Sequence, residues 1–253
     1  MSNLNFVAGG LANNIREWEK ITSDSWILNT ILGYKIEFDE IPFQNKIPVP
    51  IKFNEKQTDI IDQEVIDLLN KNAISVSKFE ANQFISNIFI VEKKNGKFRP
   101  VINLMKLNEF ITYHHFKMET LDVVLSSIKR NSFFVSIDLK DAYLSVPIYK
   151  NDRKYLKFFW KGVLYQCNAL MFGLASAPRV FTKLMKPIFA FIRQQGISSF
   201  YYIDDSLIQA NHFAKCERDA KFLVNLLESL GFVVNREKSV LIPSQEIHYL
   251  GHI

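Results

Sequence analysis

Two adjacent acidic residues, Asp204 and Asp205, lie between apolar, β-prone residues at 200–203 and 206–208. This pattern predicts a tight hairpin with Asp-Asp as its two-residue centre and both carboxylates at its tip. Aspartate is also an ordinary turn residue, so a plain surface hairpin is the alternative interpretation. Adjacent carboxylates repel each other and raise each other's pKa, and a bound divalent cation would neutralise that repulsion.

A cation held by this pair requires a third acidic residue elsewhere in the chain. Asp138 is the candidate, because it ends an apolar stretch at 133–137 and precedes Asp204 by 66 positions. An apolar stretch of this length predicts a strand that carries the carboxylate at its end. We therefore predict that Asp138, Asp204 and Asp205 lie together and bind metal.

A second candidate site is a hairpin rich in basic residues. Residues 85–94 and 97–104 are predicted strands joined by Asn95-Gly96, the strongest short hairpin signal that a sequence offers. Arginine presents a planar fork to phosphate oxygens and lysine a mobile point charge, so such a hairpin can hold a triphosphate. An edge hairpin solvated by lysines is the alternative. The cations near the tip are Lys93, Lys94, Lys97 and Arg99.

The elements that must position these residues alternate along the chain. Apolar periodicity and end signals predict helices at 15–20, 24–32, 54–72, 118–130, about 178–195 and 212–230. Further strands are predicted at 154–160, 163–168, 232–234, 240–242 and 248–250. This order predicts one α+β unit with helices on one face of an antiparallel sheet.

Two of these helices carry more detailed predictions. We expect Ser23 to cap the helix at 24–32 and Gly33 to end it. In the helix at 118–130, Thr120 is the expected cap. The apolar stripe of that helix consists of Leu121, Val124, Leu125 and Ile128.

Composition limits the class of protein. The chain has 253 residues, 48% of them hydrophobic, which supports a sizeable core and excludes a disordered chain. A formal net charge of +5 suits a polyanionic partner. The two cysteines, Cys167 and Cys216, are too few for a disulfide framework. Without a signal peptide or an 18-residue apolar run, we expect a soluble, intracellular chain with no membrane partner. The sequence does not decide between cytoplasm and nucleus.

Together these stretches resemble the reverse transcriptases of retroelements. Residues 202–205, Tyr-Ile-Asp-Asp, are similar to the family's Tyr-X-Asp-Asp motif, and residues 134–143 are similar to its first catalytic motif. The resemblance is strong over residues 55–253 and weak before them. Three stretches are closer in wording to DIRS-like retrotransposons than to retroviruses: 97–104, 172–181 and 249–251.

The resemblance implies a division of the chain into an N-terminal extension, 1–57, and a reverse transcriptase domain, 58–253. Fingers are expected at about 58–112 and 149–169, and a palm at about 113–148 and 170–253. The chain stops just after a stretch that resembles the primer grip, so we expect no thumb and no ribonuclease H domain to follow. A longer polyprotein would supply those regions.

The resemblance also assigns roles to single residues. Asp138, Asp204 and Asp205 would hold two Mg²⁺ ions, for which Mn²⁺ could substitute, and Lys238 would act as general acid to the leaving pyrophosphate. A solvated loop lysine is the alternative for Lys238. Lys94 and Arg99 match the clamp on the incoming triphosphate.

Five further positions match the family's nucleotide site. Asp141 and Ala142 fall where backbone amides meet the triphosphate, and Phe172 and Gly173 where the nascent base pair is supported. Tyr143 takes the steric-gate position, at which a bulky ring excludes a ribose 2′-hydroxyl. A tyrosine filling the core is the alternative for Tyr143. Two departures from the family pattern put the template grip in doubt: Met105, where a basic residue is usual, and Phe172, where retroviruses carry Gln.

These assignments predict an RNA-directed DNA polymerase core of a retrotransposon. Its partners would be deoxynucleoside triphosphates and an RNA or DNA template with a primer. The main rival interpretation is an inactive or truncated retroelement remnant that only binds nucleic acid. A different palm-type nucleotidyl transferase or cyclase is a further alternative, which the basic hairpin disfavours.

Overall fold

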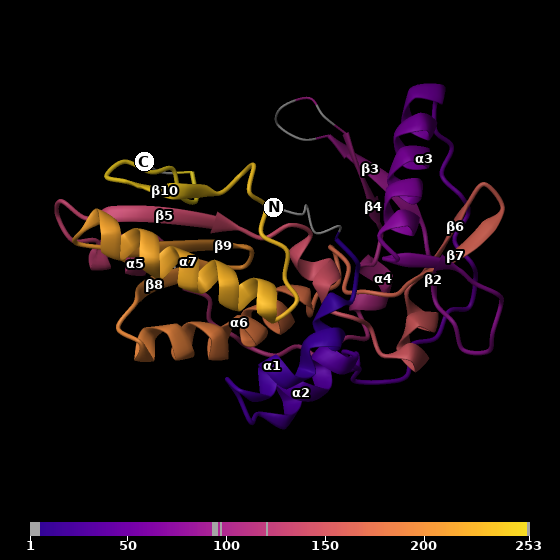
Figure 1. The fold of residues 1–253 in the computed structure, drawn as a ribbon. Helices are drawn as coiled ribbons and strands as arrows, with labels where there is room; N and C mark the ends of the chain where they lie inside the picture. The colour runs from indigo at the N-terminus through magenta and orange to yellow at the C-terminus, as the bar shows by residue number, and fades with distance from the viewer. Residues whose placement is uncertain (1–5, 93–95, 97, 120, 252–253) are drawn as a thin grey trace.

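The computed structural model describes residues 6–92, 96, 98–119 and 121–251, and Figure 1 shows two lobes joined through a shared base. One lobe contains the four-stranded sheet with β5 (Phe133–Asp138), β8 (Ser198–Tyr202), β9 (Asp205–Ala210) and β10 (Val240–Ser244), in the order β10-β5-β9-β8. All of its strand pairs are antiparallel. This lobe is the palm.

Helices α6 (Ala177–Gln194) and α7 (Phe213–Ser229) cover one face of the palm sheet (Figure 1). Alternate strand residues such as Val135 and Ile208 point to this face and join the main core. The residues between them point the other way, where Val124 of α5 (Leu121–Ser127) packs with Tyr249. That second cluster also contains Phe134, Phe200 and Leu207.

The fingers lobe is built on a smaller mixed sheet and a separate hairpin. The sheet order is β1-β7-β6-β2, with β1 at Ile74–Val76, β2 at Ile85–Ser86, β6 at Lys157–Trp160 and β7 at Val163–Cys167. The hairpin pairs β3 (Ile88–Glu92) with β4 (Phe98–Ile102), as predicted, and Glu92 opposite Phe98 is the last described pair before the turn. Helix α3 (Glu55–Asn70) packs against β4, and the short helix α4 (Met105–Asn108) follows that strand.

The first section of the chain packs into the same core as the palm. It contains the 3₁₀ turn η1 (Gly10–Asn14) and helices α1 (Ile15–Glu19) and α2 (Ser25–Leu32). Buried Trp18 donates its indole N–H to the Leu230 carbonyl at 3.0 Å, at the end of α7. Two further short turns, η2 (Ala142–Ser145) and η3 (Lys150–Tyr155), connect palm and fingers. The division at residue 57 stays a prediction.

Two of the predicted helices differ in detail from the structure. Asp24, and not Ser23, caps α2, because its carboxylate accepts the backbone N–H groups of Trp26 at 2.8 Å and Ile27 at 3.3 Å. The helix predicted at 118–130 is limited to α5, and Leu125 and Ile128 are 49% and 41% exposed. The expected cap, Thr120, lies outside the described residues.

The closing strands at 232–234 and 248–250 do not form. Val234 makes a single bridge to Leu139, and of the three predicted closing strands only β10 forms, paired with β5. Residues 235–239 instead turn back onto the end of β5 through hydrogen bonds to Asp138. The apolar residues at 232–234 are therefore explained by burial of Phe232 and Val234 in the core and not by strand pairing.

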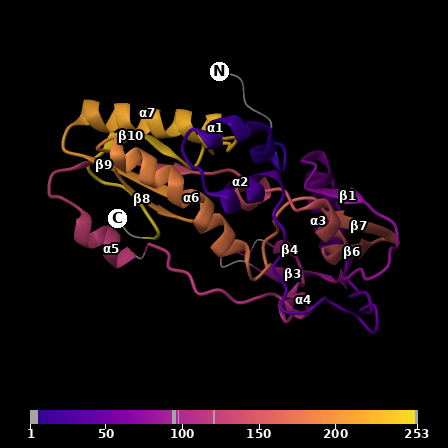
Figure 2. The same cartoon turned by 90° about the horizontal axis from the view of Figure 1, so that it is seen from below.

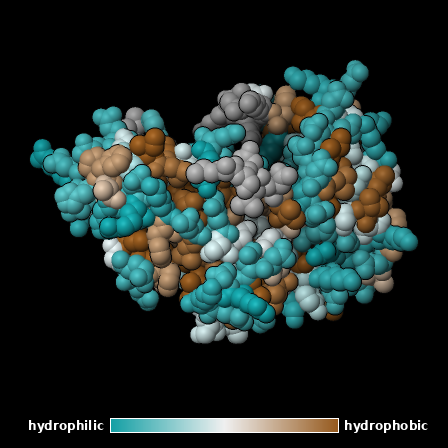
Figure 3. Space-filling view, in the orientation of Figure 1, coloured by the Kyte–Doolittle hydropathy of each residue, from teal (hydrophilic) through white to brown (hydrophobic). Residues whose placement is uncertain are grey.

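Figure 3 shows hydrophilic side chains over most of one face of the molecule, with smaller hydrophobic areas between them. Several large apolar side chains of the connector before α3 are exposed, including Ile41, Phe43 and Val49. Among the helices in the described residues, none has the length and apolar composition needed to cross a lipid bilayer.

Candidate active site

The three predicted aspartates meet at one end of the palm sheet. Asp138 ends β5 and Asp205 begins β9, and the two are directly opposite in the strand register. Side chains of directly opposite residues lie on the same face, with Cβ atoms about 5 Å apart. Asp204 lies in the preceding turn, where its carbonyl accepts the Leu139 N–H at 3.0 Å. The fold therefore gathers carboxylates that are 66 residues apart in sequence.

The turn of this hairpin differs by one position from the prediction. Tyr202 pairs with Asp205, so Ile203 and Asp204 are the two central residues and Asp205 belongs to the strand. Ile203 has a φ of 53°, in the left-handed region that β-branched residues rarely adopt. Glycine or asparagine is usual where a two-residue hairpin needs positive φ. Packing of Ile203 against the main core holds it there, and the shift places Asp205 opposite Asp138.

The electrostatics of the site disfavour three free carboxylates. Burial, followed by the charges of Asp204 and Asp138, raises the pKa of Asp205 to about 6, against the opposing effect of Lys238. Burial also raises the pKa of Asp204, and the charge of Asp138 adds to that shift. The site therefore favours either a bound proton or a cation.

The donor set fits a divalent cation, although the side chains are not closed around one. Oδ1 of Asp138 is buried and has no hydrogen-bond partner among the described residues. Carboxylate oxygens are the ligands that Mg²⁺ prefers. Within the described residues, however, no three acidic, histidine or cysteine side chains converge closely enough to form a complete metal site.

A short turn, 235–239, fixes the end of β5. The Ser239 hydroxyl accepts the Asp138 N–H at 3.0 Å and donates to the Asn235 carbonyl at 2.7 Å. The Asn235 N–H in turn donates to the Asp138 carbonyl at 2.8 Å. This turn presents Lys238, which acts electrostatically on both Asp204 and Asp205. Sequence reasoning missed Asn235 and Ser239, because such polar letters are common in loops.

The predicted nucleotide site contains a cluster of aromatic rings in contact. The Tyr143 ring lies 4.7 Å from Phe172 and 5.5 Å from Phe181 of α6, measured between ring centroids. The Arg99 guanidinium of β4 lies 4.2 Å from the Phe172 centroid. Arg99, Phe172 and Tyr143 therefore connect fingers to palm in one chain of contacts.

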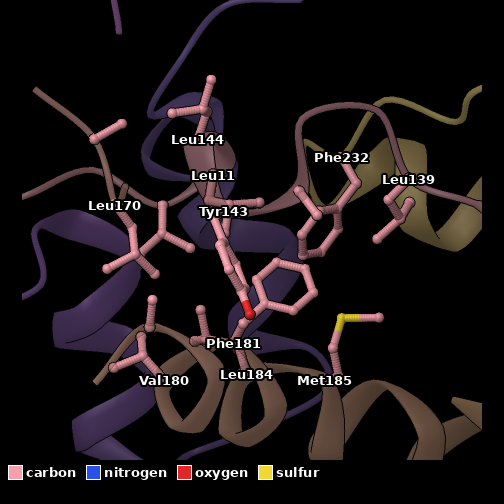
Figure 4. Packing of buried hydrophobic residues seen from close by; sticks show 14 of the residues in the cluster. Leu11, Leu139, Tyr143, Leu144, Leu170, Val180, Phe181, Leu184, Met185 and Phe232 are labelled. Atoms are coloured by element: carbon pink, nitrogen blue, oxygen red, sulfur yellow. The ribbon is translucent and has the colours of Figure 1, made fainter. Parts of the chain in front are cut away.

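Tyr143 is 5% exposed and packs deep in the palm core, against Phe181, Leu170 and Leu184 (Figure 4). Burial, followed by the charges of Asp204 and Tyr202, raises the pKa of its hydroxyl to about 12. The hydroxyl therefore stays protonated near neutral pH. The ring fills the core as one interpretation predicted, and the charge of Asp204 acts on its hydroxyl.

The backbone positions of the predicted nucleotide site are held from the fingers side. Asp141 has a φ of 50°, and its carboxylate pairs with Lys71 Nζ at 2.9 Å, while Ala142 is buried. Gly173 has a φ of 93°, and a Cβ there would lie 3.5 Å from the Ile102 carbonyl. The positive φ explains the glycine.

Asn108, which sequence reasoning missed, holds the loop that contains Phe172 and Gly173. Its side chain donates to the Gly173 carbonyl at 2.8 Å and accepts the Ala175 N–H at 2.9 Å. Met105, in the same helix, is exposed. The predicted clamp residue Lys94, with Lys93 and Lys97, lies outside the described residues.

Comparisons with known proteins agree on one family. A model of the family "Reverse transcriptase (RNA-dependent DNA polymerase)" matches residues 91–253. The chain is 30% identical over 227 residues to an enzymatic polyprotein of Soybean chlorotic mottle virus, covering 86% of this chain and 31% of the relative. It is 27% identical over 203 residues to the retrovirus-related Pol polyprotein from transposon gypsy of Drosophila melanogaster, covering 78% and 19%. The chain thus spans a third or less of these curated relatives.

A solved structure shares the fold. The foamy viral protease-reverse transcriptase in complex with dsDNA superposes with a TM-score of 0.73 at 22% sequence identity. The match covers 85% of this chain and 44% of that one.

Proposed function

Because this chain belongs to the reverse transcriptase (RNA-dependent DNA polymerase) family, we propose that it is the polymerase core of a retrotransposon polyprotein. It would transfer deoxynucleotides from their triphosphates to a primer 3′-hydroxyl on an RNA or DNA template. The observation that carries this proposal is the register of β5 and β9, which sets Asp138 opposite Asp205 with Asp204 in the adjoining turn.

Asp138, Asp204 and Asp205 are the residues that would hold two Mg²⁺ ions, or Mn²⁺ in their place. When bound, such ions lower the pKa of the primer hydroxyl and stabilise charge on the triphosphate. Lys238 lies within electrostatic reach of the carboxylates and would give a proton to the leaving pyrophosphate. The short turn at 235–239 keeps this lysine at the end of β5.

Substrate selection would rest on Arg99 and the aromatic cluster of Tyr143, Phe172 and Phe181. Arg99, with Lys94, would grip the triphosphate through charge-assisted hydrogen bonds. The Tyr143 ring, fixed between Phe172 and Phe181, would collide with a ribose 2′-hydroxyl and so favour deoxynucleotides. Phe172 and Gly173 would support the nascent base pair, with their loop held by Asn108. The amides of Asp141 and Ala142 would meet the triphosphate.

Within the retroelements, we assign the chain to the DIRS-like retrotransposons. This assignment rests on the wording of residues 97–104, 172–181 and 249–251. A thumb and a ribonuclease H region would come from other parts of a polyprotein.

Primer extension on an RNA template by the purified chain tests the proposal, with Asp204→Asn as control. We expect Mg²⁺-dependent extension by the parent and none by the variant. An inactive parent that still binds primer-template would instead support the remnant interpretation. Equal extension by parent and variant would disprove the assignment of the carboxylates.

A further inference from the structure

A groove outside the predicted catalytic site is lined by basic side chains. It has a volume of about 680 Å³ and lies between α2, residues 115–117 and α6. Figure 2 shows α2 beside α6, with the chain that links α4 to α5 passing along the same side. The cations on its wall are Lys117, Arg179, Lys183 and Lys186, and among the described residues that line it Asp24 is the one acidic residue.

The sheet separates this groove from the carboxylates. Asp138 and Asp205 share a face with Phe134 and Leu207, which pack against Val124 and not against α6. The groove uses the outer side of α6, beyond the opposite face of the sheet. It is therefore a different surface from the one that the proposed polymerase chemistry uses.

The cations of α6 form a row. Arg179, Lys183 and Lys186 follow the spacing i, i+4, i+7, which places them on one side of the helix over about 10 Å. Arg179 is partly neutralised by Glu37 at 3.4 Å. Lys183 Nζ lies 3.8 Å from the Trp26 ring centroid, and no carboxylate of the described residues pairs with Lys183 or Lys186.

A buried polar group on the same wall has no partner. Thr182 lines the groove, is 2% exposed, and its hydroxyl makes no hydrogen bond with the described residues. Pro187, also on this wall, has no N–H to donate to the Lys183 carbonyl one turn earlier. The groove thus combines positive charge with an unpaired hydroxyl, which is typical of a ligand site.

The length of the row selects the chemistry of the ligand. A single phosphate meets one or two of these cations, whereas successive phosphates of a strand can meet the whole row. The partly buried Trp26 adds an aromatic ring beside the row, and cations with aromatic rings are the usual components of single-strand binding. We propose that this groove binds the sugar-phosphate backbone of a single-stranded nucleic acid segment. This inference does not depend on polymerase activity.

The test is binding of a fluorescent 15-nucleotide oligothymidine, followed by anisotropy in the absence of divalent metal and in the Asp204→Asn background. The double variant Lys183→Gln, Lys186→Gln should bind roughly tenfold more weakly near 0.1 M salt, with a salt slope smaller by about 1.4. The matched control is Lys46→Gln, Lys221→Gln, which removes two exposed lysines elsewhere and should match the parent. Equal affinity and slope in all three proteins would overturn the proposal.

Two further measurements locate the binding. In the parent, the oligonucleotide should protect Lys183 and Lys186, but not Lys46 and Lys221, from acetylation as read by mass spectrometry. Protection that inorganic phosphate reproduces fully would show a simple anion site and overturn the strand assignment. Thr182→Val removes the unpaired hydroxyl, so it should weaken oligonucleotide binding about threefold without lowering thermal stability. Unchanged binding by this variant would exclude the Thr182 hydroxyl from the site and overturn the proposal that the strand occupies this groove.

Discussion

The two hairpins β3–β4 and β8–β9 carry the main predicted functional side chains. Their turns differ in how well the residue types suit the backbone conformation. The first has the favoured turn letters Asn95-Gly96, and Gly96 has a φ of 74°. The second turns at Ile203 and Asp204, and Ile203 is forced into the left-handed region. The residue types of the first turn favour it locally, whereas the second turn is held by the packing of Ile203 against the core. The geometry of the carboxylate site therefore depends strongly on packing around β8–β9. The basic hairpin β3–β4 depends less on the packing around it.

The surroundings of β8–β9 are specific. Strand β8 lies at the edge of the sheet, where side chains take the place of a neighbouring strand. The Tyr201 N–H donates to the Glu119 carboxylate at 3.0 Å, and the Arg193 guanidinium donates to the Ser199 carbonyl at 2.7 Å. Glu119 and Arg193 also pair with each other at 2.5 Å. In contrast, β3–β4 is a two-stranded sheet that contacts α3 and β6. Substitutions that act on one hairpin and not the other test this comparison.

The largest effect is expected at the carboxylates. Asp138→Asn should lower metal-dependent primer extension by about 10³-fold, equivalent to about 4 kcal/mol, because it removes a charge that the cations need. Circular dichroism should show an unchanged fold. Extension at the parent rate would contradict the role of β5 and β9 in metal binding.

The next effect concerns the edge of β8. Glu119→Ala should lower the free energy of unfolding by about 2 kcal/mol, because it leaves the Tyr201 N–H without its acceptor and Arg193 without its carboxylate partner. Urea denaturation measures the loss. The control is Glu92→Ala on β3, which removes an exposed carboxylate and should change stability by less than about 0.5 kcal/mol. Equal losses in both variants would remove the distinction between the hairpins.

A smaller effect follows from the raised pKa of Asp205. The unfolded carboxyl loses its proton near pH 3.8, whereas the folded one holds it to about pH 6. Stability of the metal-free chain therefore falls as pH rises through this window and stays lower above it. Asp205→Asn should be more stable than the parent by about 1 kcal/mol at pH 7, a value reduced for partial exposure.

The stability difference between Asp205→Asn and the parent should vanish below about pH 3.8, where the parent is protonated in both states. Thermal melts across pH measure it. Added Mg²⁺ should stabilise the parent and leave Asp205→Asn unaffected. A difference that grows on acidification would reverse the predicted sign.

The smallest effects come from the turns themselves. Gly96→Ala should destabilise by about 1 kcal/mol through backbone strain alone, because no atom lies within 4 Å of the added Cβ. Ile203→Gly relieves strain but loses packing against the core, so its net change should stay within about 1 kcal/mol. Parallel thermal melts compare the two, and a large stabilisation by Ile203→Gly would show that packing of Ile203 contributes little.

The sequence predicted the elements that depend on local signals, namely apolar periodicity and the residues that begin or end helices and turns. Helices α3, α6 and α7, the β3–β4 and β6–β7 hairpins, and the strand that ends in Asp138 all follow such signals. The α5 prediction was too long, because the apolar letters Leu125 and Ile128 are exposed and contribute no core contact.

The sequence could not predict contacts between segments that are distant along the chain. No local signal shows that Ser239 holds Asp138, that Asn108 holds the loop at Gly173, or that Glu119 closes the edge of β8. The one-position shift of the turn to Ile203 and Asp204 was missed for the same reason. The register that pairs Asp205 with Asp138 overrides the turn preference of Asp204 and Asp205.

The hydrogen bond from Trp18 to Leu230 joins residues 212 positions apart, and it bears on the order of folding. Trp18 packs its ring against Phe232, which follows α7. Helix α1 therefore cannot complete its burial until residues up to Phe232 have left the ribosome. Contacts between residues so far apart in sequence slow folding. During synthesis the N-terminal segment would remain a partly open intermediate with its tryptophan unburied, a state in which chaperones or aggregation compete for the chain.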